Sequence, residues 1–436
     1  MKKFLYSVFM LAAVVLAACS NDDNGDTQPK RGMILNASVE NLSSRATMTD
    51  ESGTWKFAFA ANDKVSVSNN KISNYYTFTN NGSQFTCAQA EATTENADWY
   101  AYFPGNEVDL KNQTGTFADV ANKFAVAGKT AQTTTGEKGL SITLKPKVAV
   151  LRVVAVDKKG ILDIHVKTTA DDKWGKGLTA TKNAAEFTVS TSDTKTTLLH
   201  KAEGTVNAGE INYVVVPAGV KIEIYNGDLL LNKTKDAGLT AGKYYTITSG
   251  PTKGTETATL ANGTTETVEW VQLWAGGPRF ATKNVAEEMT WTDAAKTGKN
   301  YAWGEKWRTP TAAEVTEEGG LQAEWNTKEG KWVVKEGSPT INVTTKDGIE
   351  ETVEFTGVQP GYTKNTLTLY NKIDSHGYSH FNFWTTTENN GYGCMYRIMI
   401  DKGIIGIFGP SSFESKDTKC LVRPVLSIQN ITNNKK

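Results

Sequence analysis

The chain has 436 residues, a length that suits two to four domains. Its 47 Lys and Arg residues balance 47 Asp and Glu residues, so the formal net charge is zero. Nucleic-acid binding needs clustered Lys and Arg to neutralise phosphates, and the sequence holds no long basic block, which argues against such a partner. The wealth of Thr, Asn, Gly and Val is typical of a secreted, mainly β protein.

Residues 1–18 predict a secretory signal peptide, because a basic start precedes an apolar run that is too short for a transmembrane helix of about 20 residues. A Leu-Ala-Ala motif precedes Cys19 and resembles the bacterial lipobox. That resemblance implies cleavage before Cys19 and acyl chains, palmitate among them, on this residue, which would anchor the protein in a membrane. The alternative is an ordinary signal peptide with an incidental cysteine.

Residues 19–32 are polar and acidic, so we expect a flexible tether. The acidic stretch also resembles an export signal for the outer face of the outer membrane. The expected location is therefore the cell outer membrane, with the protein lipid-anchored and surface-exposed.

Two β-sandwich domains are predicted next, over residues 33–145 and 146–249. Short runs of alternating apolar and polar residues, separated by turn residues such as Asn and Gly, indicate strands at 33–39, 64–68, 75–78 and 99–103. The run 148–156 is almost continuously apolar, as expected for a strand that is covered on both faces. Sheets packed in layers are the natural way to bury so many short strands.

The order of several segments in this half resembles the fimbrillin-like lipoproteins of Gram-negative anaerobes. The segments that carry the resemblance are Arg45-Ala46-Thr47, Trp55 and residues 62–67, 99–104, 144–153 and 241–247. The resemblance covers about half of the chain and implies two tandem sandwich domains of the fimbrillin or transthyretin-like type. The family's His in the first strand of the second domain is missing here, where Lys145-Pro146-Lys147 stands.

In that family an Arg-specific protease trims the chain in a loop after the first strand, and a strand of the next subunit fills the groove that is left. The resemblance places proteolytic processing between Arg45 and Ala46 of this chain and makes other fimbrial subunits its partners. The alternative is an ordinary solvent-facing arginine in a polar loop. Assembly of this kind is β-strand addition, in which main-chain hydrogen bonds supply affinity and alternate side-chain pockets supply specificity.

Residues 250–267 predict a linker or a hairpin, and a different domain follows over 268–428, with a short tail at 429–436. Eight of the eleven Trp residues lie beyond residue 268. A helix should begin at Thr309–Thr311, where Glu314 follows Thr311 by three residues as in a capping box, and end near Gly319 and Gly320.

Three motifs of this domain resemble a bacterial C-type-lectin-like domain, an α+β fold similar to that of the formylglycine-generating enzymes. The motifs are Ala281-Thr282-Lys283-Asn284-Val285, Trp307-Arg308-Thr309-Pro310 and Val422-Arg423-Pro424-Val425. We interpret their arginines as partners of buried carbonyls and Trp307 as a core residue. The calcium-binding loops of sugar-binding lectins are not matched, since Glu388-Asn389-Asn390 lacks their proline. Calcium is therefore not supported, and neither a metal nor another cofactor is predicted.

Cys394 and Cys420 lie in one unit and could form a disulfide in an oxidising envelope, while Cys87 fits a buried thiol in a strand. A reactive pair, as in the formylglycine-generating enzymes, is the alternative for Cys394 and Cys420. Aromatic residues in or beside the loops that carry ligands in lectin-like folds form a candidate ligand face. Its members are Tyr378, Phe381, Trp384, Tyr392 and Tyr396.

No catalytic residues are predicted, because no GxSxG, HExxH or phosphate-loop motif occurs and no carboxylate pair is legible. We therefore expect a protein that is not an enzyme. The first hypothesis is a fimbrial subunit or adhesin in a tip or accessory position, because the extra C-terminal domain would obstruct a free C-terminal donor strand. The second is a non-polymerising outer-membrane lipoprotein whose lectin-like domain binds a glycan or protein ligand.

Overall fold

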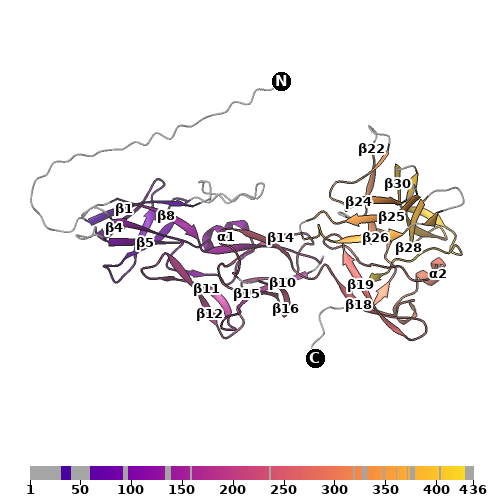
Figure 1. Ribbon diagram of the computed structural model, residues 1–436, viewed down its shortest axis with the longest axis horizontal. Coiled ribbons are helices and arrows are strands. Elements are labelled where there is room, and N and C mark those ends of the chain that lie inside the picture. The colour runs from indigo at the N-terminus through magenta and orange to yellow at the C-terminus, as the bar shows by residue number, and fades with distance from the viewer. Residues whose placement is uncertain are drawn as a thin grey trace, which may run out of the picture.

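The structure is a computed structural model in which β-strands dominate and the helices are few and short (Figure 1). It describes residues 31–40, 59–91, 97–132, 139–157, 160–234, 237–317, 320–326, 331–346, 349–359, 361–370, 372–373, 379–401 and 404–427. The chain runs along the long axis, from its N-terminal sheets at one end to its C-terminal sheets at the other (Figure 1). The prediction of a mainly β protein with a smaller helical part is confirmed.

The first sheet closes on itself into a barrel in the order β1-β4-β3-β2-β5-β7-β8. Its strands are β1 (Arg31–Val39), β2 (Lys64–Asn69), β3 (Tyr76–Asn80), β4 (Phe85–Glu91), β5 (Ala97–Phe103), β7 (Val126–Gln132) and β8 (Gly139–Pro146). This arrangement corrects the expected two-layer sandwich over 33–145. The reason is β1, which pairs antiparallel with β4 and parallel with β8 and so joins the two edges of the sheet.

Two further sheets follow. The larger has the order β12-β11-β10-β15-β16, with β13 paired to β10 and β6 to β11. Its strands are β6 (Glu107–Asp109), β10 (Gly160–Thr168), β11 (Trp174–Thr181), β12 (Glu186–Ser192), β13 (Leu199–Val206), β15 (Ile222–Asn226) and β16 (Leu229–Lys233). The smaller sheet contains β14 (Ile211–Pro217), β9 (Val148–Val154) and β17 (Tyr244–Thr248), in that order.

One continuous hydrophobic core serves all three of these sheets. It runs from Met33 in β1 to Ile224 in β15. Every residue of β9 except Arg152 is buried, which confirms the expected strand with two covered faces. Strand β6 lies between β5 and β7 in the chain, but it pairs with β11 and so belongs to the next sheet. The helix α1 (Phe117–Lys123) packs on β14, where the rings of Phe117 and Tyr213 lie 5.2 Å apart.

The C-terminal half begins with a five-stranded sheet in the order β18-β19-β20-β31-β21. Its strands are β18 (Lys253–Thr259), β19 (Thr265–Gln272), β20 (Arg279–Ala281), β31 (Val425–Leu426) and β21 (Trp307–Arg308). Most of the segment 250–267 therefore lies in the β18–β19 hairpin, and of the two interpretations, linker or hairpin, the structure shows the hairpin.

Three smaller sheets complete this half. They contain β22 (Ala323–Asn326) with β23 (Lys331–Val334); β24 (Thr340–Lys346), β25 (Ile349–Thr356) and β26 (Thr366–Tyr370); and β27 (Lys372–Ile373), β28 (Ser379–Asn389), β29 (Tyr392–Asp401) and β30 (Ile404–Glu414). The short helices are α2 (Trp291–Ala294), the 3₁₀ turn η1 (Gly298–Asn300) and α3 (Ala312–Thr316).

The start of α3 follows from its sequence. Thr311 accepts a hydrogen bond from the backbone N–H of Glu314, and the Glu314 carboxylate accepts one from the N–H of Thr311. This capping box confirms the predicted helix start. The helix ends at Thr316, before the predicted end at the glycine pair.

The two halves of the molecule meet through a backbone hydrogen bond, an ion pair and a buried tyrosine. The carbonyl oxygen of Val156 accepts a hydrogen bond of 2.7 Å from the N–H of Gly276. The guanidinium of Arg279 lies 3.1 Å from the carboxylate of Asp157. Tyr362 is fully buried and packs against Val156. Burial raises the pKa of Tyr362 well above its usual range, so its hydroxyl stays neutral in this junction.

Candidate functional site

The first strand, β1, occupies a slot between two strands that are distant in sequence. Its first part, Arg31 to Leu35, pairs with β4, and its later part, from Ile34 to Val39, pairs with β8. Just after the strand, the N–H of Glu40 still donates a 2.8 Å hydrogen bond to β8. Without β1, the edges of β4 and β8 would face each other with unpaired backbone groups. The slot is therefore a site for one extended strand.

Alternate side chains of β1 point into the core. Met33 and Leu35 are 1% and 0% exposed, and Ala37 and Val39 pack against the same core while partly buried. Asn36, between them, is exposed. Full burial of a Met or Leu side chain contributes about 1.5–3 kcal/mol each, so the first two inward positions hold the strand most firmly.

The walls of the slot carry the matching pattern. In β8, Leu140, Ile142 and Leu144 are buried and the residues between them are exposed. Only the end of this strand was singled out from the sequence, although the alternation over residues 140–144 was a readable signal. The parallel pairing of β8 with β1 was not predicted, because a local sequence pattern does not indicate which distant strand will pair with it.

The predicted lipidation and processing residues lie outside the described residues. Cys19 precedes β1, and Arg45 and Ala46 follow it in the chain. Lipidation of Cys19 and cleavage after Arg45 stay predictions.

The candidate ligand face needs correction. Phe381, Trp384 and Tyr396 are each 0% exposed. Phe381 and Tyr396 belong to the core between β25, β26 and β28, whereas Trp384 belongs to a second core on the other face of β28. The sheet is covered on both faces, so the aromatic side chains that point to either face are buried in a core. Of the predicted set, Tyr392 is 52% exposed and Tyr378 lies outside the described residues.

The two arginines of the C-terminal motifs, Arg308 and Arg423, were predicted to be structural, and both make contacts within the fold. Arg423 is 0% exposed and donates hydrogen bonds to the carbonyl oxygens of Ala281 and Thr368 at 3.1 and 3.0 Å. Arg308 donates to the carbonyl oxygen of Thr309 and to the carboxylate of Glu314. These contacts confirm that the motif arginines are structural.

The three cysteines that the structure describes, Cys87, Cys394 and Cys420, are buried. Cys420 packs in the core that holds Trp384, and burial raises the pKa of the Cys394 thiol above its ordinary value, with a hydrogen bond to Thr385 acting the other way. A raised pKa suppresses the thiolate that redox chemistry requires. The disulfide between Cys394 and Cys420 stays a prediction. The buried thiol expected at Cys87 is confirmed.

Among the described residues, no group of three or more His, Cys, Asp or Glu side chains is arranged to hold a metal ion. None of the described helices has the length and apolar character needed to span a bilayer.

The geometry thus defines a predominantly β protein whose first strand closes its N-terminal sheet. No protein-family model matches the sequence, and no curated protein matches it. Solved structures of low similarity do match. One, described as a "putative cell adhesion protein" from Bacteroides ovatus, is 10% identical with a TM-score of 0.32 and covers 56% of this chain and 96% of its own.

A "putative cell adhesion protein" from Bacteroides uniformis is 14% identical with a TM-score of 0.30, covering 55% of this chain and 97% of its own. A "fimbrial protein" from Bacteroides ovatus is 11% identical with a TM-score of 0.24, covering 92% of this chain and 100% of its own. Similarities at this level establish neither the fold nor the function of this chain.

Proposed function

We propose that the chain is a non-enzymatic cell-surface lipoprotein that enters a fimbria as a tip or accessory subunit by exchanging its first strand. The observation that supports this proposal is the position of β1 in the slot between β4 and β8. Because β1 pairs on both of its edges, its removal would expose two rows of backbone hydrogen-bonding groups at once. A strand from a second subunit would restore both rows of hydrogen bonds and refill the positions of Met33 and Leu35.

Cleavage after Arg45 would have two consequences at the same time. It would cut the covalent link between β1 and the rest of the sheet, and it would separate the chain from a lipid on Cys19. The slot would then open only in molecules that are leaving the membrane anchor. This order protects the apolar slot until a partner strand is available, since an open slot exposes strand edges that favour aggregation.

The test is N-terminal mass analysis of the protein from membranes and from sheared fibre fractions of the same cells. We expect a chain that begins at Ala46 in fibres and a chain that begins at lipidated Cys19 in membranes. Arg45→Ala should abolish the fibre form, whereas the matched control Arg31→Ala should leave the start at Ala46. A fibre-associated chain that still begins at Cys19 would contradict strand exchange.

The tip or accessory position has its own test. If the purified chain that begins at Ala46 forms long homopolymers alone, it is a shaft subunit instead. The alternative function, a non-polymerising surface lipoprotein that binds a glycan or protein ligand through its C-terminal unit, loses the face first predicted for it, because Phe381, Trp384 and Tyr396 are core residues.

A further inference from the structure

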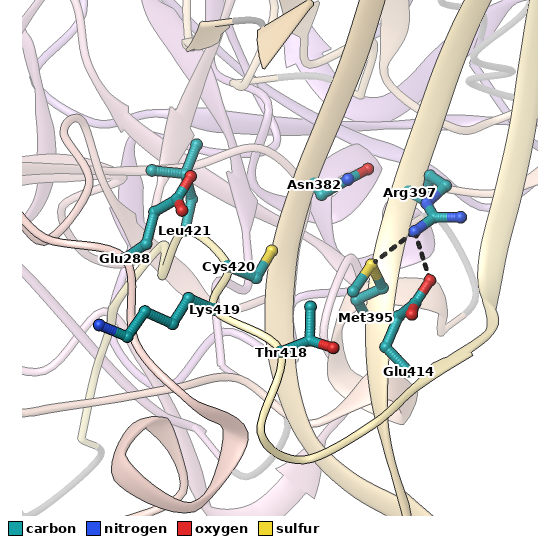
Figure 2. Close-up of a pocket in the computed structure, with 9 residues that line it drawn as sticks. All are labelled: Glu288, Asn382, Met395, Arg397, Glu414, Thr418, Lys419, Cys420 and Leu421. Carbon is teal, nitrogen blue, oxygen red and sulfur yellow. Dashed lines mark hydrogen bonds and ion pairs between the residues drawn. The ribbon is translucent and has the colours of Figure 1, made fainter. Parts of the chain in front are cut away.

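A cavity of about 170 Å³ lies on one face of the β28–β30 sheet (Figure 2). Asn382 of β28 and Arg397 of β29 are directly opposite each other in the register and both line it. Their neighbours Phe383 and Tyr396 point to the other face and into the core. The cavity is therefore built on rigid strands, with the segment 418–421 as its opposite wall (Figure 2).

The charges around the cavity balance. Glu288 and Glu414 supply two carboxylates, and Arg397 and Lys419 supply two cations. Arg397 donates a 2.9 Å hydrogen bond to Glu414, and both side chains remain partly exposed, at 26% and 35%. An anionic ligand would meet the two carboxylates and a cationic ligand the two cations. The lining thus favours a neutral ligand that both donates and accepts hydrogen bonds.

Two buried polar atoms belong to residues of the cavity lining and lack a hydrogen-bond partner among the described residues. They are Oδ1 of Asn382 and Nε of Arg397. Buried polar groups are nearly always satisfied, and one that is not costs stability until a partner arrives. The acceptor, Oδ1 of Asn382, and the donor, Nε of Arg397, belong to residues that lie opposite each other on β28 and β29, in the same wall of the cavity (Figure 2).

The volume of the cavity and its apolar lining residues further restrict the chemical class of the ligand. The volume equals that of roughly six liquid waters and falls below the range of about 300–1,000 Å³ that drug-sized ligands need. Met395 and Leu421 add apolar contacts that suit the C–H groups of a ring. One sugar residue combines a small volume, apolar C–H groups and hydroxyls that donate and accept.

We propose that this cavity binds a single neutral sugar residue, such as the end of a glycan, without calcium. Asn382 and Arg397 would bind its hydroxyls, and Lys419 would contact it from the exposed rim. None of the aromatic residues predicted as a ligand face is among the described residues that line this cavity. It would give the C-terminal unit a ligand whether or not β1 is exchanged, so its failure and that of strand exchange are separate results.

The experiment is a ligand-observed NMR titration of the chain from Ser20 onward. The probes are the methyl glycosides of glucose, galactose, mannose and N-acetylglucosamine, with glucuronate and glucosamine as charged counterparts. A ligand of this size should bind in the millimolar range. At least one neutral glycoside should bind more tightly than either charged sugar.

Variants assign the binding to the cavity. Asn382→Leu keeps the side-chain size and removes the amide, so affinity should fall at least about tenfold, as expected for the loss of hydrogen bonds in a site of this kind. Lys419→Met, on the exposed rim, should weaken binding severalfold and leaves folding intact, which keeps the test decisive if Asn382→Leu does not fold. Lys129→Met removes a comparable exposed ion pair with Asp98 in the N-terminal sheet, far along the chain from the cavity, and should change nothing.

Three results would overturn the proposal. The first is that no neutral glycoside binds. The second is that binding is unchanged in both Asn382→Leu and Lys419→Met. The third is that N-acetyl amino-acid amides bind while the glycosides do not, which would assign the cavity to a peptide.

Discussion

Replacing Leu35 with Ala tests whether β1 holds the N-terminal sheet closed. Leu35 is 0% exposed and lies where β1 pairs with both β4 and β8. A buried Leu→Ala change removes the transfer energy of the lost methyl groups and leaves a cavity, at a cost of about 2–5 kcal/mol. Domains are stable by only about 5–15 kcal/mol, so this loss should shift the unfolding midpoint visibly.

The assay is urea unfolding of the chain from Ser20 onward, followed by circular dichroism and tryptophan fluorescence. Trp99 of β5 is fully buried in the same core, so its emission supplies the part of the fluorescence change that comes from this sheet. Asn36→Ala is the matched control, because Asn36 is the exposed neighbour on the same strand and should change stability by less than about 0.5 kcal/mol. If Asn36→Ala costs as much as Leu35→Ala, the inward and outward faces of β1 are exchanged and the proposed slot is wrong.

Two further predictions concern the C-terminal half. Burial alone would raise the pKa of Glu314, but hydrogen bonds, chiefly from Arg308, outweigh it and hold the pKa below its ordinary 4.5. The resulting stability is present above pH 4.5 and is lost as the pH falls through the folded-state pKa. Glu314→Gln should therefore reduce the loss of stability at acid pH in a profile of unfolding free energy against pH, and an unchanged loss would contradict the assignment. Gly277→Ala should destabilise the protein by about 1–3 kcal/mol in thermal or urea unfolding, because the added Cβ would lie 2.4 Å from the buried Trp274 ring. The control Gly139→Ala should be nearly neutral, because its Cβ would meet no described heavy atom within 4 Å. Equal effects of the two changes would refute the packing argument.

The parts of the fold that could be predicted from the sequence are those that local physics determines. The apolar run of β9 indicated a strand with two covered faces, and the spacing of Thr311 and Glu314 indicated a capped helix; both are confirmed. The closure of the first sheet was not predicted, because the parallel pairing of β1 with β8 depends on which distant edge remains open. Alternation along a strand gives the parity of its side chains but not the identity of the neighbour.

The ligand face was misjudged for a related reason. The sequence around Phe381 and Trp384 shows aromatic residues of both parities, which is compatible with one buried and one ligand-binding face. The structure covers both faces, with one core on each side of β28. The residues of the cavity were missed, since Asn382, Arg397 and Glu414 are ordinary polar residues in the sequence. The register of β28 and β29 places Asn382 opposite Arg397, and the side chain of Glu414 reaches Arg397 from β30.

Strand exchange and ligand binding can coexist in one subunit only if the site that opens during assembly shares no core with the site that must stay intact. Here the slot of β1 is lined by the core that runs from Met33 to Ile224, and no residue of that core lines the cavity. The junction at Arg279 and Tyr362 connects the two halves but belongs to neither site. Opening of the N-terminal sheet, as proposed, should therefore leave the β28–β30 face unchanged. A subunit that has accepted a foreign strand would still present the proposed sugar site in the C-terminal half, at the other end of the molecule (Figure 1).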